Sequence, residues 1–236
     1  MARKPRIFIS KLPHHVIQRG NNKGQIFFSE NDYLVFLSML KEAKKKHPCR
    51  IYTYCLMKNH FHLIVEPEES NNISLLMKLL GAKYVHYINK KYNRTGTLWE
   101  GRFKCSLIEE DSYFLTCLRY VEMNPVRAGL CNRPDDYPWS GYKFRAYGLK
   151  SEILDIDTWY NSAGDTGEKR QEIYRKLFDI PIPDWTTKLI RKISQRNGII
   201  GSENFIQDMC KIKGEGIILR HPGRPRKNNS DPVSKL

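Results

Sequence analysis

Several features that would assign this chain to a common class are missing from its sequence. None of the six cysteines forms a C-x-x-C motif, so neither a zinc knuckle nor a disulfide framework is indicated. No apolar run is long enough to span a bilayer, and no charged segment followed by an apolar run and small residues opens the sequence. We therefore expect a soluble, cytoplasmic protein with free cysteines and no membrane partner.

Acidic residues are scarce relative to basic ones. The chain contains 40 Lys and Arg residues against 25 Asp and Glu residues, which gives a formal net charge of +15 in 236 residues. An excess of this size favours a polyanion over an acidic protein surface as the partner. Nucleic acid is therefore the leading candidate, and we expect the protein to associate with the nucleoid.

Hydrophobic periodicity predicts strands that alternate with helices. The predicted strands are residues 14–19, 25–28, 50–57 and 61–66, followed by one that begins within LWEGRFKCSLI, and the predicted helices are about 30–47, 73–88 and 112–124. The first two strands should form a hairpin, because GNNKG between them tolerates the backbone angles of a tight turn. Ser29 and Asp32 resemble a capping box. This order predicts an α+β fold in which helices cover an antiparallel sheet.

Two histidines that flank one aromatic residue begin one of the predicted strands. In NHFHLIV, a period of two places Phe61 and Leu63 on one face and His60 and His62 on the other. Residues two apart in a strand are separated by roughly 6.6 Å, so both imidazoles can bind one ion at about 2.1 Å. The spacing permits a metal site without requiring one, since polar residues on a solvated face give the same pattern.

The third predicted helix places a tyrosine one turn before an amide. One stripe of this helix has spacings of four, three and four: Tyr113, Cys117, Tyr120 and Asn124. Of the tyrosines considered as nucleophiles, only Tyr120 has an oxygen ligand four residues on. With His60 and His62, Asn124 would form a mixed nitrogen and oxygen site with open positions for phosphate oxygens, as Mg²⁺ or Mn²⁺ requires. A tyrosine at a core edge followed by a helix-terminal asparagine would give the same stripe.

Four motifs follow one another along the chain: NHFHLIV, GTLWEGRFK, LRYVEMNPVRAGL and YPWSGY. In this order they resemble the single-tyrosine HUH transposases, specifically the IS200-like REP-associated tyrosine transposases, over about residues 10–147. The resemblance implies a ferredoxin-like or RRM-like sheet, with His60, His62 and Asn124 as metal ligands and Tyr120 as the nucleophile. It also implies a transposase that cleaves and rejoins single-stranded DNA with REP-like hairpins through a 5′-phosphotyrosine intermediate.

Further polar and aromatic residues are candidate DNA contacts. They are Arg19, Asn21, Asn22 and Lys23 at the predicted hairpin tip, Trp99, Arg102 and Lys104 in and after LWEGRFK, Arg127 after Asn-Pro, and Arg224 and Arg226 in the tail. Two alternatives stay open: Trp99 as a core anchor, and Arg127 as the partner of Glu122. The tail sequence RHPGRPRKNNS resembles an AT-hook, whose arginines enter a narrow minor groove.

The chain divides into a catalytic domain (1–148), a helical accessory region (149–219) and a basic AT-hook-like tail (220–236). Helices predicted at about 168–178, 186–196 and 202–213 fit either a DNA-binding helix-turn-helix or a bracket against the catalytic domain. The main functional alternative is a non-catalytic regulator of the same fold that binds hairpin DNA or RNA. A metallohydrolase and a zinc deaminase are disfavoured because H-x-H-x-D-H and P-C-x-x-C are absent. A homodimer is compatible with the sequence.

Overall fold

The computed structural model of the protein describes residues 6–110 and 112–213. Its strands are β1 (His14–Arg19), β2 (Cys49–Met57), β3 (His60–Pro67), β4 (Lys104–Ile108) and β5 (Ile199–Ile200). Its helices are η1 (Asn21–Lys23), α1 (Glu30–Lys46), α2 (Asn72–Lys91), α3 (Ser112–Glu122), α4 (Asn124–Arg127), η2 (Pro134–Asp136), α5 (Tyr142–Tyr147), α6 (Thr158–Ser162), α7 (Gly167–Leu177), α8 (Asp184–Gln195) and α9 (Glu203–Lys213). None of the helices in these two ranges is both long and apolar enough to cross a membrane.

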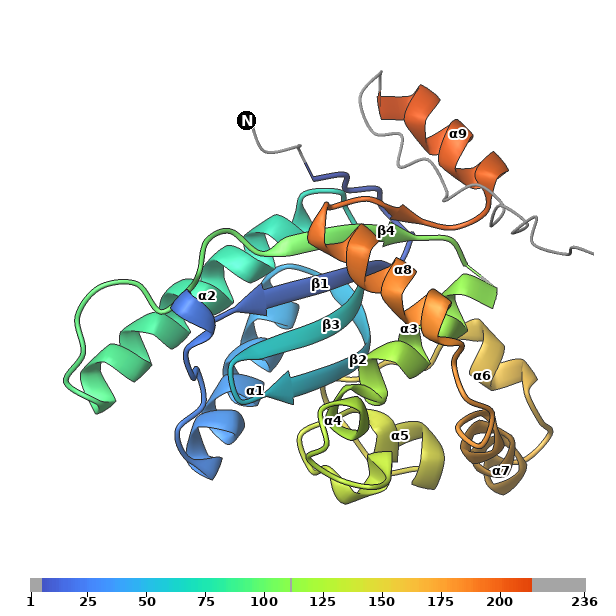
Figure 1. Cartoon of the computed structure of the whole chain (residues 1–236), viewed down its shortest axis with the longest axis horizontal. Helices are drawn as coiled ribbons and strands as arrows, with labels where there is room; N and C mark the ends of the chain where they lie inside the picture. The colour runs from blue at the N-terminus through green and yellow to red at the C-terminus, as the bar shows by residue number, and fades with distance from the viewer. Residues whose placement is uncertain (1–5, 111, 214–236) are drawn as a thin grey trace, which may run out of the picture.

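The strands form one five-stranded sheet in the order β2-β3-β1-β4-β5 (Figure 1). The pairs β2–β3, β3–β1 and β1–β4 are antiparallel, as predicted, whereas the short strand β5 runs parallel to β4. Helix α1 connects β1 to β2 and α2 connects β3 to β4. The α+β prediction is therefore confirmed, with one correction: β5 makes the sheet mixed.

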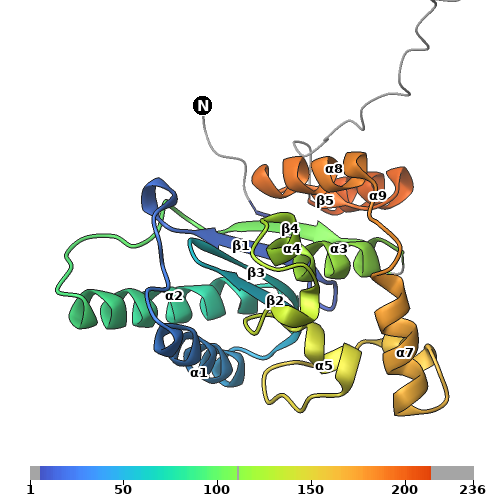
Figure 2. The same cartoon turned by 60° about the horizontal axis from the view of Figure 1, so that its bottom comes forward.

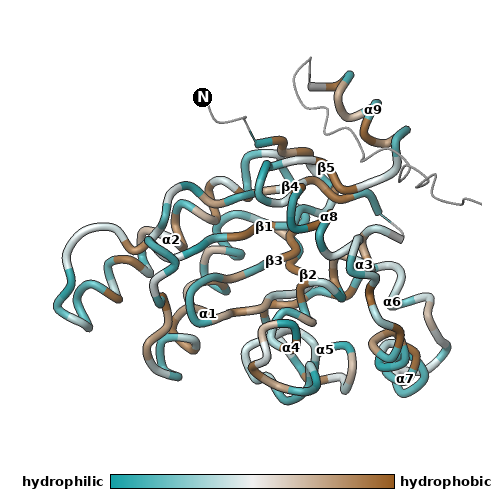
Figure 3. The backbone as a smooth tube through the Cα atoms, in the orientation of Figure 1, coloured by the Kyte–Doolittle hydropathy of each residue, from teal (hydrophilic) through white to brown (hydrophobic). Residues whose placement is uncertain are grey.

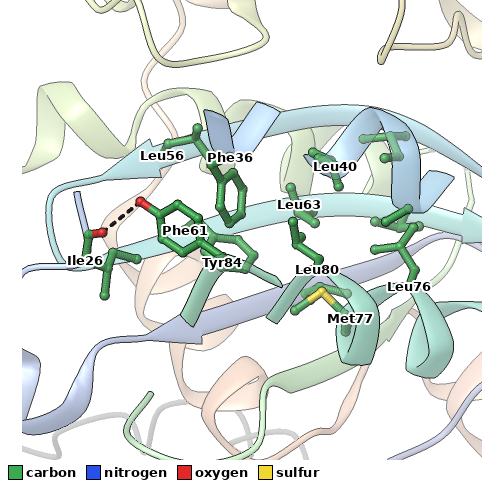
Figure 4. Close-up of a cluster of buried hydrophobic side chains, with 14 of the residues drawn as sticks. Ile26, Phe36, Leu40, Leu56, Phe61, Leu63, Leu76, Met77, Leu80 and Tyr84 are labelled. Carbon is green, nitrogen blue, oxygen red and sulfur yellow. Dashed lines mark hydrogen bonds between the residues drawn. The ribbon is translucent and has the colours of Figure 1, made fainter. Parts of the chain in front are cut away.

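Each face of the sheet is covered by its own set of helices. Phe61, Leu63 and Val65 of β3 belong to a core that α1 and α2 complete (Figure 4). The alternate residue Ile64 belongs to a second core, formed with α3, α5, α7 and α8. Figure 2 shows α1 and α2 on the side of the sheet opposite α3 and α8, and Figure 3 shows hydrophobic stretches along β1 and β3. The predicted alternation in β3 is thus confirmed.

Residues 25–28 do not form the predicted second strand of a hairpin. After η1, the backbone N–H of Ile26 donates to the carbonyl of Lys58 in the β2–β3 connection at 2.8 Å. Ile26 and Phe27 are buried in the core, and the Tyr84 hydroxyl donates to the Ile26 carbonyl at 2.8 Å. The apolar composition of this segment therefore reflects burial without strand pairing, and β1 pairs with β3 and β4 instead.

The predicted capping residue Asp32 ties the start of α1 to the end of α2. Its buried carboxylate accepts hydrogen bonds at 2.6 to 2.9 Å from five donors: the backbone N–H groups of Phe28 and Ser29, Lys91 Nζ, and the hydroxyls of Tyr87 and Tyr92. Burial by itself raises the pKa of this carboxyl, but the hydrogen bonds outweigh it and lower the pKa from 3.8 to about 2. The charged form of Asp32 is therefore stabilised in the folded protein.

Asp32→Asn should reduce the free energy of unfolding by about 1–3 kcal/mol at pH 7, because an amide nitrogen then faces hydrogen-bond donors. Since the folded pKa is depressed, this stabilisation is present above the unfolded pKa and is lost as pH falls. The difference between parent and variant should shrink between about pH 4 and pH 2 in urea titrations. Glu152→Gln is the control, because the Glu152–Lys41 ion pair is exposed. An equal loss of unfolding free energy in both variants would contradict the stabilising role of the buried Asp32 carboxylate.

The chain after residue 148 returns to the same sheet. The three helices predicted in this region occur as α7, α8 and α9. Strand β5 adds to the sheet edge, and α8 contacts β1 and β4. A fully buried ion pair between Arg145 and Asp157, 2.7 Å apart, fixes the chain between α5 and α6. Residues from this part of the chain therefore lie close to the central strands.

Candidate active site

The central strands align a group of polar side chains on one face of the sheet. Antiparallel pairing places Ile17 of β1 beside His62, and Arg19 beside His60. Strand β4 adds Lys104, which is paired with Ile17. Because alternate residues of a strand share a face, these polar side chains lie on the side of α3 and α8.

The end of α3 supplies the tyrosine and the asparagine. Helix α3 ends at Glu122, as Pro125 predicted, and α4 begins at Asn124. Asn124 Nδ2 donates to the carbonyl oxygens of Tyr120 at 3.2 Å and Val121 at 3.1 Å. These bonds satisfy carbonyls at the helix end and use only the amide nitrogen. Asn124 Oδ1 takes no part in them, which leaves an oxygen ligand beside Tyr120.

These groups converge on one pocket of about 670 Å³. Eight residues singled out in the sequence line it: Arg19, His60, His62, Arg102, Lys104, Tyr120, Asn124 and Arg127. Helix α8 adds Thr187, Arg191 and Gln195. Among the described residues that line the pocket, Glu100 is the only acid, against four arginines and one lysine. The pocket is therefore suited to an anionic ligand.

Among the other candidate DNA contacts, Asn21, Asn22, Lys23 and Trp99 do not line this pocket. Asn21, Asn22 and Lys23 form the exposed turn η1 at the end of β1. Trp99 is half-buried, with its ring centre 6.0 Å from that of Phe61 and 6.1 Å from that of Tyr84. These contacts are those of a core anchor. Arg224 and Arg226 lie outside the described residues.

Arg127 does not pair with Glu122, which was one of its two predicted partners. Glu122 is buried and instead accepts hydrogen bonds from the hydroxyls of Thr53 at 2.6 Å and Tyr174 at 2.7 Å. Arg127 donates to the Tyr120 carbonyl at 2.6 Å, and its guanidinium lies 4.2 Å from the centre of the Tyr120 ring. Arg127 therefore stabilises Tyr120 and remains part of the pocket wall.

Tyr120 is 5 % exposed and lies close to the histidines. Its ring centre is 6.1 Å from that of His62. Burial raises the pKa of the Tyr120 hydroxyl above its ordinary value, while the charges of Arg127 and Arg191 act in the opposite direction. Tyr120 is thus neutral at pH 7, and two cations are placed to favour its phenolate.

The two histidines of β3 are in the form that binds metals. Burial and the charge of Arg19 lower the pKa of His60 to about 4, and burial together with the neighbouring His15 and His60 holds the pKa of His62 well below its ordinary value. His60 Nδ1 is 2.7 Å from Asn59 Oδ1, and His62 Nδ1 is 2.8 Å from His15 Nε2. Both rings are therefore neutral at pH 7, and each has Nε2 left as a potential ligand.

The geometry fits one divalent ion. The ring centres of His60 and His62 are 5.0 Å apart. An ion about 2.1 Å from a ring nitrogen lies roughly 3 Å from the ring centre, so both rings can reach the same ion. In the described part of the chain, no three His, Cys, Asp or Glu side chains form a potential metal site. A third protein ligand from the described residues would therefore be of another type, and Asn124 offers an amide oxygen in the same pocket.

Residues 8–124 match a family model described as "Transposase IS200 like". This segment therefore belongs to the IS200-like transposase family. A Haemophilus influenzae protein named as a REP-associated tyrosine transposase is 27% identical over 138 residues, which cover 53% of this chain and 76% of that protein. The solved structure of a REP-associated tyrosine transposase bound to a REP hairpin is 21% identical, with a TM-score of 0.55, and the match covers 70% of this chain and 98% of that one. This second likeness shows a shared fold.

The IS200-like segment contains His60, His62, Tyr120 and Asn124, but not α8. The sequence did not indicate that residues of α8 line the pocket or that His15 contacts His62. Residues 187, 191 and 195 recur every four positions in a predicted helix, which indicates a shared stripe. Nothing in that spacing indicates that the stripe faces β1 and β3.

Proposed function

We propose that this IS200-like transposase cleaves and rejoins single-stranded DNA beside a REP-type hairpin, with Tyr120 as the nucleophile. The observation that carries the proposal is the convergence of Tyr120, His60, His62 and Asn124 on one cationic pocket. The choice of hairpin DNA is supported by the named relative and by the solved relative bound to a REP hairpin.

The reaction exchanges one phosphate ester for another. The Tyr120 oxygen attacks the scissile phosphorus and loses its proton, while the bond from phosphorus to the 3′ oxygen breaks and that oxygen takes up a proton. The products are a 5′-phosphotyrosine and a free 3′-OH. Because a phenolate is a better leaving group than an alkoxide, a 3′-OH can later displace Tyr120 and rejoin a strand without another energy source.

The pocket residues support this exchange in different ways. Arg127 and Arg191 favour the phenolate of Tyr120. Arg19, Arg102 and Lys104 line the same pocket and suit phosphate oxygens on either side of the scissile bond. Mg²⁺ or Mn²⁺ held by His60, His62 and Asn124 would polarise the scissile phosphate.

Three further groups extend the proposed DNA contacts. Asn21, Asn22 and Lys23 present amides and a cation at the exposed turn after β1. The half-buried Trp99 is proposed to stack a base on the accessible part of its ring, beside its core contacts. Arg224 and Arg226 of the basic tail are proposed to contact the minor groove of the hairpin stem.

Incubation with Mn²⁺ and a hairpin oligonucleotide that carries a single-stranded 5′ flank should give a covalent protein–DNA product. A denaturing gel detects it as a protein band of lower mobility, together with a shortened DNA strand that ends in 3′-OH. The control is an oligonucleotide of the same composition without the hairpin. Tight binding of the hairpin with no cleavage in any divalent metal would contradict the proposal and leave a non-catalytic binding protein.

A further inference from the structure

A buried chain of three side chains links α8 to the proposed metal ligand His62. His15 Nε2 is 2.8 Å from His62 Nδ1, and His15 Nδ1 is 3.0 Å from Ser194 Oγ. The planes of the two imidazoles are inclined by only 16°. His15 is 0 % exposed, His62 4 % and Ser194 1 %, so bulk water cannot substitute for a missing member.

We propose that His15 and Ser194 are positioning residues that fix the orientation and the tautomer of His62 for metal binding. The proposal rests on the proposed function, because it takes His62 as a ligand. It assigns a role to α8, which lies outside the matched family segment.

The hydrogen-bond chain has two possible directions. In the first, His62 Nδ1–H donates to His15 Nε2, and His15 Nδ1–H donates to Ser194 Oγ. In the second, the Ser194 hydroxyl donates to His15 Nδ1, and His15 Nε2–H donates to His62 Nδ1. Each neutral imidazole has one protonated nitrogen, so the two directions place opposite tautomers on His62.

Only the first direction makes His62 a metal ligand. It leaves His62 Nε2 with a lone pair, whereas the second puts a proton there. An acceptor for the other ring nitrogen is the usual support of a metal-binding histidine. Ser194 can serve either direction, because a hydroxyl both donates and accepts. Metal binding therefore selects the first direction, and His15 and Ser194 supply the acceptors that it needs.

His15 also has a defined place in the strand that suits this role. It precedes Ile17 and Arg19 on the same face of β1, and in the sheet it lies beside Ile64 and Ser106. His62 is diagonal to it on β3. The sheet thus holds the two imidazoles together, while Ser194 contacts the second nitrogen of His15 from α8.

The test measures Mn²⁺ affinity of the DNA-free protein from the electron paramagnetic resonance signal of free Mn²⁺. His15→Leu, which removes the acceptor, should weaken Mn²⁺ binding by about 10–100-fold. His15→Gln keeps an oxygen acceptor and should recover a large part of the affinity. If His15 served packing alone, both substitutions should weaken Mn²⁺ binding equally, and this result would overturn the proposal.

Ser106 provides a matched control for Ser194, the last member of the hydrogen-bond chain. Like Ser194, it is a buried serine next to His15, but in the described part of the structure its Oγ has no hydrogen-bond partner. Ser194→Ala should weaken Mn²⁺ binding by about tenfold, the lower end of the range for such supporting residues. Ser106→Ala should leave it unchanged. Equal effects of the two substitutions would contradict the role of Ser194.

Nitrogen NMR of the imidazoles gives a second readout that does not depend on activity. In the Mn²⁺-free parent with diamagnetic Mg²⁺ added, the His62 signals should show a protonated Nδ1. In Ser194→Ala the opposite tautomer should gain population. If the parent protein binds no divalent metal at all, the proposed function and this inference both fail; if it binds metal but the variants leave affinity and tautomer unchanged, only this inference fails.

Discussion

Tyr120→Phe should form no covalent product with hairpin DNA while binding it with near-parent affinity. The substitution removes only the hydroxyl that is proposed to attack phosphorus, so covalent chemistry is lost altogether. The ring should keep its contacts with the His62 ring and the Arg127 guanidinium, because these do not need the hydroxyl, and only the interaction of Arg127 with the Tyr120 oxygen is lost. Denaturing gels measure the covalent product, and fluorescence anisotropy in the same buffer measures binding.

Two other tyrosines serve as controls for this variant. Tyr113 lies two turns earlier on the same stripe of α3, and Tyr84 is buried on the opposite side of the sheet. Tyr113→Phe and Tyr84→Phe should both keep the covalent product. Tyr84→Phe loses the hydrogen bond to the Ile26 carbonyl, which should cost about 1 kcal/mol of stability. A covalent product from Tyr120→Phe, or its loss in either control, would show that the nucleophile is another residue.

Removing the divalent metal should abolish cleavage and spare a large part of the binding. Excess chelator should eliminate the covalent product, and Mn²⁺ added back should restore it. Binding should persist because the cations of the pocket contact phosphates without the metal. His60→Ala should reproduce the chelator's effect, with cleavage reduced by at least about a hundredfold if metal-assisted charge stabilisation is lost.

The control for the histidine variant is His86→Ala. His86 is exposed on α2, on the other side of the sheet from the pocket. It should cleave as the parent does at every metal concentration. Undiminished cleavage in chelator would rule out a metal role for His60 and His62, while cleavage by His60→Ala that needs higher Mn²⁺ would assign His60 to metal affinity.

Local patterns in the sequence predicted the parts of the site that depend on spacing alone. The alternation in β3 correctly put His60 and His62 on one face, and Pro125 correctly ended α3 near Asn124. The i to i+4 relation then placed Tyr120 beside Asn124. Their roles stay predictions, but the structure brings all four residues to one pocket.

The predictions that were wrong or incomplete concern packing between segments that are distant in the sequence. Residues 25–28 have the composition of a strand, yet burial of Ile26 and Phe27 explains that composition without a hairpin. Arg127 is five residues from Glu122, but Glu122 points into a core that includes Tyr174 of α7. Neither the neighbours of His15 nor the position of α8 can be deduced from periodicity, because both depend on the order of strands and on what packs across them.

The contact between His15 and Ser194 joins residues 179 positions apart, so the proposed support of His62 can form only after α8 has been synthesised. The residues that form β1, β3 and α3 are synthesised before those of α8. Closing so long a loop is also among the late steps of folding, because its entropy has to be offset by contacts formed earlier. A translation product that stops before residue 184 lacks one wall of the pocket. If Ser194 supports His62 as proposed, such a product should bind Mn²⁺ more weakly than the full chain.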